Sequence, residues 1–167
     1  QGMTVILNGD RLVSTDPNDG VMGVTVLIDG QALQFDLPTY AMEHLMSSGV
    51  NPKRIGAVFF THLHWDHIMG FPEFSFTRSH WAKGPIQVFG PQGTKKMVQG
   101  AQQFNAVHIH ALPNYLENTA TPDNDVSAEV KALKQALSAK VTEIQSAGVV
   151  LETETFKVTT TTVLHSV

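Results

Sequence analysis

The segment from residue 55 to residue 70 constrains the fold most strongly, because a short apolar run leads directly into a cluster of metal-binding side chains. The run IGAVFFT is continuously apolar, which is typical of a strand covered on both faces. The sequence HLHWDHIMG then places His62, His64, Asp66 and His67 within six positions. We therefore expect a layered α/β domain with a mixed sheet, in which this strand ends at a functional site.

The spacing of these four side chains indicates metal binding. In extended backbone, side chains at i and i+2 point the same way, so His62 and His64 can hold one cation. A turn after them brings Asp66 and His67 towards a second position. Two ions about 3.5–4 Å apart can clamp the attacking and leaving atoms of a displacement. The competing interpretation, four polar residues on a surface loop, is disfavoured because the cluster directly follows a buried strand and ends in Gly70.

Composition limits which metals and partners suit the chain. Its 167 residues are enough for one domain with a core. Cysteine is absent, so any ligands must be His, Asp or Glu, which favours zinc, with manganese or iron as alternatives. The net charge of −4 and the scattered basic residues argue against strong nucleic-acid binding, but not against a small anionic substrate.

Hydropathy gives no sign of membrane association. No apolar run approaches the roughly 18 residues that span a bilayer, and no signal peptide is visible. We expect a soluble protein, and its compartment, cytoplasmic or periplasmic or secreted after signal removal, stays undecided.

Strand and helix signals alternate along the rest of the chain. Residues 23–36 predict a hairpin around Asp29-Gly30, a pair suited to a type I′ turn. Further strands are expected at 3–7, 86–91, 106–112 and 149–167, helices at 38–49 and 93–104, and a polar loop at 113–125. The last predicted helix, 126–146, rests on apolar residues three or four positions apart: Val126, Val130, Leu133, Leu137, Val141 and Ile144.

The motif THLHWDH after VFF, with LQFD before it and GFP after it, resembles the metallo-β-lactamase superfamily. The later VFGPQGT resembles its branch of tRNase Z-like phosphodiesterases and arylsulfatase-like hydrolases. The resemblance implies an αββα sandwich with a pair of metal ions at one sheet edge. It assigns His62 and His64 to the first ion, and Asp66 and His67 to the second.

The same resemblance extends to three further expectations. His165 would be the third ligand of the first metal ion, and Asp66 would take part in catalysis. Asp36 would not bind the ion itself but would support one of its ligands. The family usually has Gly two residues after this Asp, where this chain has Pro38, so the turn is expected to differ.

The resemblance covers residues 1–167 as one domain, but only the N-terminal half of the family fold. The family continues beyond the counterpart of His165 with a bridging aspartate and a last histidine. Three explanations stay open: the remainder lies in a segment beyond Val167, this chain is a fragment, or a complementary C-terminal polypeptide or a homo-oligomer completes the site. Residues 113–148 correspond to a region where the family inserts variable elements, and a variable insertion with an amphipathic helix is expected there.

The leading functional hypothesis is a metal-dependent hydrolase that attacks a small-molecule ester with a metal-bound hydroxide. The resemblance favours a phosphodiester or sulfate ester over a lactone. The alternative is an incomplete or non-catalytic half-domain that binds metal and assembles with a complementary chain. A mononuclear iron enzyme that uses oxygen is a minor third possibility.

Other conspicuous residues have simpler interpretations. Trp65 is expected to pack under the site, and Glu73 to be a solvated loop charge. The phenylalanines after the motif are expected in the core, and the remaining histidines on helix, strand or loop surfaces: Phe71, Phe74, Phe76, His44, His80, His108 and His110.

Overall fold

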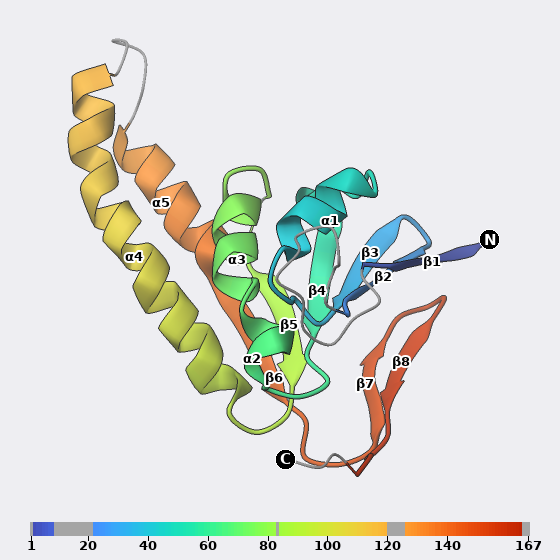
Figure 1. The fold of residues 1–167 in the computed structure, drawn as a ribbon. Coiled ribbons are helices and arrows are strands. Elements are labelled where there is room, and N and C mark those ends of the chain that lie inside the picture. Colours follow the sequence, from blue (N-terminus) through green and yellow to red (C-terminus); the bar gives the residue numbers. More distant parts are fainter. Residues whose placement is uncertain (1, 9–21, 83, 120–125, 165–167) are drawn as a thin grey trace.

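The computed structural model describes residues 2–8, 22–82, 84–119 and 126–164 (Figure 1). A six-stranded sheet has the order β1-β2-β3-β4-β5-β6, and β7 and β8 form a second sheet. The strands are β1 Met3–Leu7, β2 Val24–Ile28, β3 Gln31–Phe35, β4 Ile55–Phe59, β5 Ile86–Gly90, β6 Ala139–Glu143, β7 Gly148–Glu152 and β8 Lys157–Thr160. The helices are α1 Ala41–Ser47, α2 Trp65–Ile68, α3 Phe71–Ser79, α4 Thr94–Thr119 and α5 Val126–Leu137, with a 3₁₀ turn at Pro52–Arg54.

The main sheet is antiparallel at one side and parallel at the other. The β2–β3 turn has positive φ at both Asp29 (48°) and Gly30 (75°), as the predicted type I′ hairpin requires. From β3 to β6 all neighbours are parallel, so their carboxyl ends meet at one edge of the sheet. Residues that directly follow β3 and β4 are therefore brought together there, and this edge carries the predicted metal ligands.

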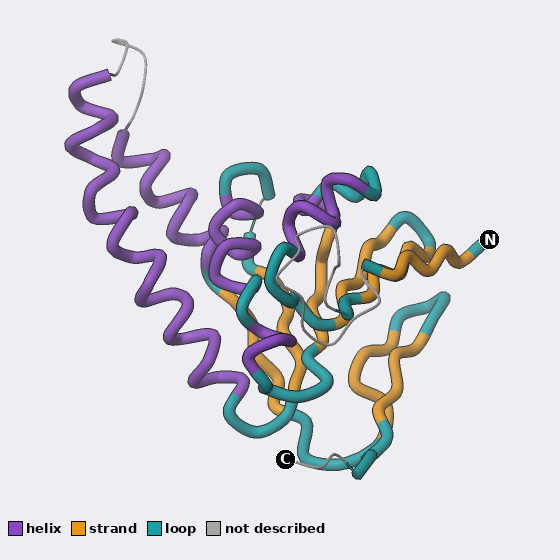
Figure 2. The backbone as a smooth tube through the Cα atoms, in the orientation of Figure 1, coloured by secondary structure: helices purple, strands orange, loops and turns teal. Residues whose placement is uncertain are grey.

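Two apolar layers lie on opposite faces of the main sheet. On one face, the helices bury the larger cluster, which includes Leu45, Phe71, Phe74, Ile86, Val88 and Val98 (Figures 1 and 2). On the other face, Leu33, Ala57, Phe59 and Phe89 pack against apolar residues of β7 and β8. The described residues thus form three layers, helices, sheet and sheet, of the expected αββα sandwich.

A buried arginine connects the helical layer to the sheet. Arg78 of α3 is 5% exposed; its Nε donates to the Ile55 carbonyl at 3.0 Å and its Nη1 to the Gly84 carbonyl at 3.3 Å. Burial lowers the pKa of this guanidinium. The two bonds join the start of β4 to the residues before β5.

The predicted strand at 106–112 is wrong, and so is the predicted loop over residues 113–119, because α4 continues to Thr119; the rest of that predicted loop, 120–125, lies outside the described residues. The reason is visible in burial. Val98, Ala101, Asn105 and Ile109 are all at most 5% exposed, and their spacing follows one face of a helix. The local alternation of AVHIHAL is thus overridden by packing against α3 and α5.

The predicted helix 126–146 is right only in its first part, because α5 ends at Leu137 and β6 begins at Ala139. Val141 lies four residues after Leu137, a spacing that continues a helix but equally suits one face of a strand. Parallel pairing with β5 decides for the strand. The predicted strand 149–167 is split into β7 and β8, and residues 161–164 lie in neither. The predicted insertion at 113–148 begins inside α4 and includes α5 and β6, so its limits stay a prediction.

Among the residues that the structure describes, no helix combines the length and the apolar character needed to cross a membrane.

Candidate metal centre

The edge where β3 and β4 end is organised by Asp36. This residue follows β3 and has a positive φ of 56°. Its backbone N–H donates to the Phe59 carbonyl at 2.8 Å, which continues the parallel pairing. Its carboxylate accepts the Thr61 backbone N–H at 2.8 Å and the Thr61 hydroxyl at 2.7 Å. Thr61, which begins the loop that carries His62 and His64 (the histidine-rich loop), is therefore held to the end of β3.

The first histidine pair lies on the loop between β4 and α2. The Nε2 of His62 and the Nδ1 of His64 are 3.1 Å apart, and the two rings meet edge to face. Extended backbone at His64 (ψ 148°) accounts for the shared direction of side chains two positions apart. The two side chains thus lie together, as the spacing indicates, and their role as metal ligands stays a prediction.

The second pair lies on α2. His67 is buried, and its Nδ1 lies 2.8 Å from Asp36 Oδ2, while its Nε2 lies 3.8 Å from Asp66 Oδ2. The rings of His62 and His67 are 4.0 Å apart between centroids. All four motif side chains are thus gathered at one edge, with the buried carboxylate of Asp36 behind them.

Hydrogen-bond chemistry specifies which ring nitrogens carry protons. A carboxylate only accepts, so in the neutral rings His67 must donate through Nδ1–H, leaving its Nε2 unprotonated. The Thr61 hydroxyl gives its proton to Asp36, so it accepts from His62 Nδ1–H at 3.0 Å. The Nε2 atoms of His62 and His67 are therefore the unprotonated nitrogens, the form that a metal ion needs. The Nδ1 atom of His64, 3.1 Å from His62 Nε2, donates to that nitrogen in this arrangement and would have to lose its proton to bind the same ion.

The donor set suits a divalent ion in part. Metal–nitrogen bonds of about 2.0–2.1 Å place two ligand nitrogens about 3–3.4 Å apart at ordinary ligand angles. The 3.1 Å between His62 and His64 fits this spacing, whereas the 3.8 Å between Asp66 and His67 is wider. Within the described ranges, no three His, Cys, Asp or Glu side chains form a complete metal-binding group. The predicted third ligand, His165, lies outside the described residues.

Close packing fixes the loop that follows the motif. A Cβ on Gly70 would lie 2.2 Å from the Pro38 carbonyl oxygen, so only glycine fits there. The Gly70 N–H donates to the Leu37 carbonyl at 2.9 Å, and the Leu37 N–H donates to the His67 carbonyl at 2.8 Å. These two hydrogen bonds therefore connect the turn after Asp36 to the end of α2.

The aromatic residues near the motif agree with expectation only in part. Trp65 is 57% exposed and does not pack under the site as predicted. Phe71 and Phe74 are core residues, as predicted.

Phe76 and the exposed Phe104 line a hollow between α3 and α4, with Glu73 at its side. Partial burial, and then the charge of Glu43, raises the pKa of the Glu73 carboxyl.

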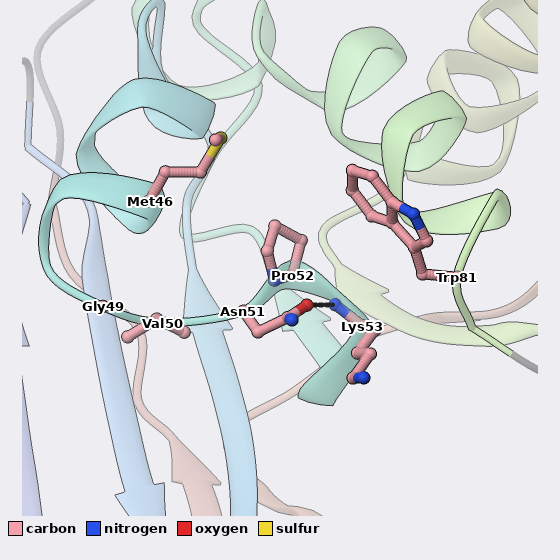
Figure 3. Close-up of a pocket in the computed structure, with 7 residues that line it drawn as sticks. All are labelled: Met46, Gly49, Val50, Asn51, Pro52, Lys53 and Trp81. Carbon is pink, nitrogen blue, oxygen red and sulfur yellow. Dashed lines mark hydrogen bonds between the residues drawn. The ribbon is translucent and has the colours of Figure 1, made fainter.

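A second hollow, shown in Figure 3, lies at the opposite end of β4 from the motif. Met46 and Trp81, both exposed, flank a turn in which the Asn51 side chain accepts the Lys53 N–H at 3.0 Å. None of its lining residues is a predicted metal ligand.

Sequence reasoning missed Thr61 and a chain of buried polar residues behind Asp36. Thr61 directly precedes His62, and its hydroxyl connects the Asp36 carboxylate to the His62 ring. The buried chain includes Gln34, in the middle of a strand where an apolar residue is expected. The polar Gln34 between the apolar Leu33 and Phe35 was the available signal.

Comparison with known proteins identifies relatives. A family model described as Anti-Pycsar protein Apyc1 matches residues 22–166. Ribonuclease Z of Bacillus cereus (strain B4264) is 31% identical over 113 residues, covering 65% of this chain and 37% of that protein. Ribonuclease Z of Bacillus anthracis (strain CDC 684 / NRRL 3495) has the same identity and coverage. The chain thus spans little more than a third of the length of these curated relatives.

Solved structures agree on the fold. The short form of human tRNase Z has a TM-score of 0.56 and 28% identity, over 61% of this chain and 39% of that chain. The metallo-beta-lactamase fold protein YhfI from Bacillus subtilis has a TM-score of 0.60 and 14% identity, over 90% of this chain and 50% of that one. The second likeness shows the fold alone, and the predicted fold class is confirmed.

Proposed function

Since the chain belongs to the family described as Anti-Pycsar protein Apyc1, within the metallo-β-lactamase-fold proteins that include tRNase Z, we propose that it is a metal-dependent phosphodiesterase. The observation that carries the proposal is the pair of imidazole nitrogens of His62 and His64, 3.1 Å apart, beside a His67 ring anchored by Asp36. Zinc is the ion that suits this cysteine-free, histidine-rich set, with manganese and iron as alternatives.

In this proposal, each residue of the site has a distinct task. His62 and His64 hold the first ion, with His165 as its third ligand, and His67 and Asp66 hold the second. A divalent ion held there would supply a water nucleophile at neutral pH and stabilise negative charge on the substrate. Asp36 keeps the His67 ring oriented, and through Thr61 it keeps the His62 ring oriented. Asp66 also takes part in catalysis, beside the Nε2 atom of His67.

The names of the relatives favour one substrate class. Ribonuclease Z and tRNase Z are named for RNA and tRNA, whose backbone is a phosphodiester. We therefore place phosphodiesters ahead of sulfate esters and lactones. RNA becomes a candidate substrate beside the small-molecule ester expected from the sequence, although the net charge of −4 provides no strong electrostatic attraction for nucleic acid.

A second candidate is a metal-binding half-domain that needs a complementary polypeptide or a second copy. The observation that favours it is the incomplete donor set among the described residues. In this alternative, one ion binds weakly and the isolated chain turns over no substrate.

Metal content and turnover, measured on the same preparations, test both candidates. The full chain is loaded with Zn²⁺ or Mn²⁺, its bound metal is counted by mass spectrometry, and hydrolysis of bis(p-nitrophenyl) phosphate and of a precursor tRNA is followed. We expect metal binding and turnover that His62→Ala and His67→Ala abolish. The exposed His110 on α4 provides the matched control, and His110→Ala should change neither.

The outcomes separate the two candidates. Bound metal with no turnover of either substrate would favour the half-domain. Absence of both metal and turnover would overturn the phosphodiesterase proposal for this chain, and turnover that survives in His62→Ala would remove the proposed metal site from the reaction.

A further inference from the structure

Three buried polar side chains form a continuous row across the first strands of the main sheet. Asn8 directly follows β1, Thr25 lies in β2 and Gln34 lies in β3, and they are 4%, 0% and 0% exposed. The Asn8 Nδ2 donates to the Thr25 hydroxyl at 2.8 Å, and that hydroxyl donates to the Gln34 Oε1 at 2.6 Å. A row of this kind is costly inside a sheet, because each buried polar group must find a partner.

The row ends at the backbone of Asp36. The Gln34 Nε2 donates to the Asp36 carbonyl at 2.7 Å and also contacts the Phe35 carbonyl at 3.3 Å. The orientation of the Gln34 amide is determined by its neighbours, because a carbonyl can only accept and the Thr25 hydroxyl has already accepted from Asn8. All bonds of the row therefore run in one direction, towards Asp36.

Asp36 needs such support because its backbone conformation is unfavourable. A φ of 56° is uncommon for a residue other than glycine, and a residue kept in a sparsely populated region persists only when its surroundings hold it there. The Asp36 carboxylate accepts two hydrogen bonds from Thr61 and one from His67. The row from Asn8 to Gln34 holds it from the opposite side, through its carbonyl.

We propose that Asn8, Thr25 and Gln34 are positioning residues of the metal centre. By holding Asp36 in its left-handed conformation, they keep its carboxylate on His67 Nδ1, so that the unprotonated Nε2 faces Asp66. Of these three residues, Gln34 is decisive, because its side chain donates the hydrogen bond to Asp36. The inference rests on the proposed function only in treating His67 as a metal ligand.

The test observes the His67 ring directly, in the 167-residue chain freed of metal. Long-range ¹H–¹⁵N correlation of the imidazole reports which ring nitrogen carries the proton. In the unmodified chain we expect a single Nδ1–H tautomer with a slowly exchanging proton. Gln34→Met keeps the length of the side chain but removes its amide, and we expect a mixture of tautomers and at least about tenfold faster exchange of the ring proton, as expected when the contact opens locally.

Metal affinity is the second readout. Loss of a group that orients a ligand typically weakens metal binding by about 10–100-fold. Because Gln34 acts one contact further away, we expect Gln34→Met to raise the dissociation constant for Co²⁺ or Zn²⁺ by about tenfold, at the lower end of that range.

Matched variants separate positioning from general stability. Val88→Ala removes methyl groups from a fully buried position of β5, so it destabilises the fold without touching the row. It should leave the His67 tautomer unchanged. If Gln34→Met does not fold, Thr25→Val and Thr25→Ser decide, because only Ser keeps the hydroxyl that contacts Gln34 and should preserve the single tautomer.

Two results would overturn the inference: a His67 ring that keeps its single tautomer in Gln34→Met and in Thr25→Val, or one that changes equally in Val88→Ala. The tautomer experiment uses neither metal nor substrate. Failure of the proposed phosphodiesterase activity would therefore leave it standing, and its own failure would leave the activity assay unaffected.

Discussion

Single residues with unusual local requirements shape the metal centre. Asp36 occupies a backbone region that most side chains avoid, and its carboxylate collects three donors from the histidine-rich loop and α2. Gly70 closes the same corner, because the Pro38 carbonyl leaves no space for a Cβ. Both lie next to predicted metal ligands. The geometry of the site therefore depends on residues that would not themselves bind the ion.

Gly70→Ala should destabilise the protein and disturb the site. The added methyl group would overlap the Pro38 carbonyl oxygen, so the Leu37–Gly70 bond must open, and overpacking of this kind costs about 1–3 kcal/mol. Urea unfolding measures the loss. Gly100→Ala in α4 is the matched control: its Cβ would meet nothing within 4 Å, and the exchange should stabilise the helix by up to about 1 kcal/mol. Equal effects of the two exchanges would contradict this account.

Individual elements are held by contacts that their own sequences do not predict. The helix α4 presents Val98, Ala101, Asn105 and Ile109 to its neighbours. Asn105 of α4 also bonds to α3: its Nδ2 donates to the Pro72 carbonyl at 3.0 Å and to the Ser75 hydroxyl at 3.1 Å. The amino end of α4 is tied to β6, because Glu143 Oε1 accepts the N–H groups of Gly93 and Lys95 at 2.9 Å each.

The helical register of α4 predicts unequal effects of two neighbouring exchanges. Ile109 is 4% exposed and packs with Leu133 and Leu137 of α5, so Ile109→Ala should cost about 2–5 kcal/mol of unfolding free energy. Val107 is 73% exposed, and Val107→Ala should change it by no more than about 0.5 kcal/mol. In the strand once expected at 106–112, the two residues would share one face. Similar losses in denaturant titrations would therefore favour the strand.

The hydrogen bonds of Arg78 attach α3 to the sheet, and their contribution to stability can be measured by removing the guanidinium. Arg78→Met leaves the carbonyls of Ile55 and Gly84 without this donor, and an unsatisfied buried acceptor costs about 1–3 kcal/mol. Thermal unfolding of Arg78→Met should therefore show a clear loss. Arg54→Met, at an exposed position of the 3₁₀ turn, makes the same chemical change and should have little effect. If the exposed exchange proved as costly, the buried hydrogen bonds would not be the cause.

At the scale of the whole molecule, the two faces of the main sheet are covered very differently. The helices bury one face, whereas the other is covered by the β7–β8 hairpin (Figure 1). Between the two sheets, the rings of Phe35, Phe59 and Phe89 stack with 4.8 Å between successive centroids. Met3, Val5 and Leu7 on β1 remain at least 50% exposed. The aromatic row is therefore a large part of the apolar surface against which the hairpin packs.

Phe59→Ala should loosen the hairpin before the main sheet. Phe59 is 5% exposed at the centre of the aromatic row, so its truncation should cost about 3–5 kcal/mol. Amide hydrogen exchange should show the largest loss of protection in β7 and β8, with less in β4 and β5. Phe104→Ala, at a 73% exposed position, is the control and should leave exchange in both sheets unchanged. Uniform loss of protection across both sheets would rule out a separable hairpin.

Features that depend on a few consecutive residues could be predicted from the amino-acid order. The Asp29-Gly30 turn, the apolar strand before the motif and the closeness of His62 to His64 follow from backbone geometry over two or three positions. The resemblance of the motif is sufficient to predict the fold class, and it places Asp36 next to the metal ligands. Local geometry carries such features because neighbouring side chains have few relative directions available.

Features that depend on contacts between distant segments became visible in the folded chain. Parallel pairing of β3 with β4 brings Asp36 to Thr61 and His67, and pairing of β5 with β6 converts the end of a predicted helix into a strand. The row from Asn8 to Gln34 likewise exists only because three strands lie side by side. An amphipathic spacing of four residues suits a helix and a strand alike, and burial against a partner selects between them.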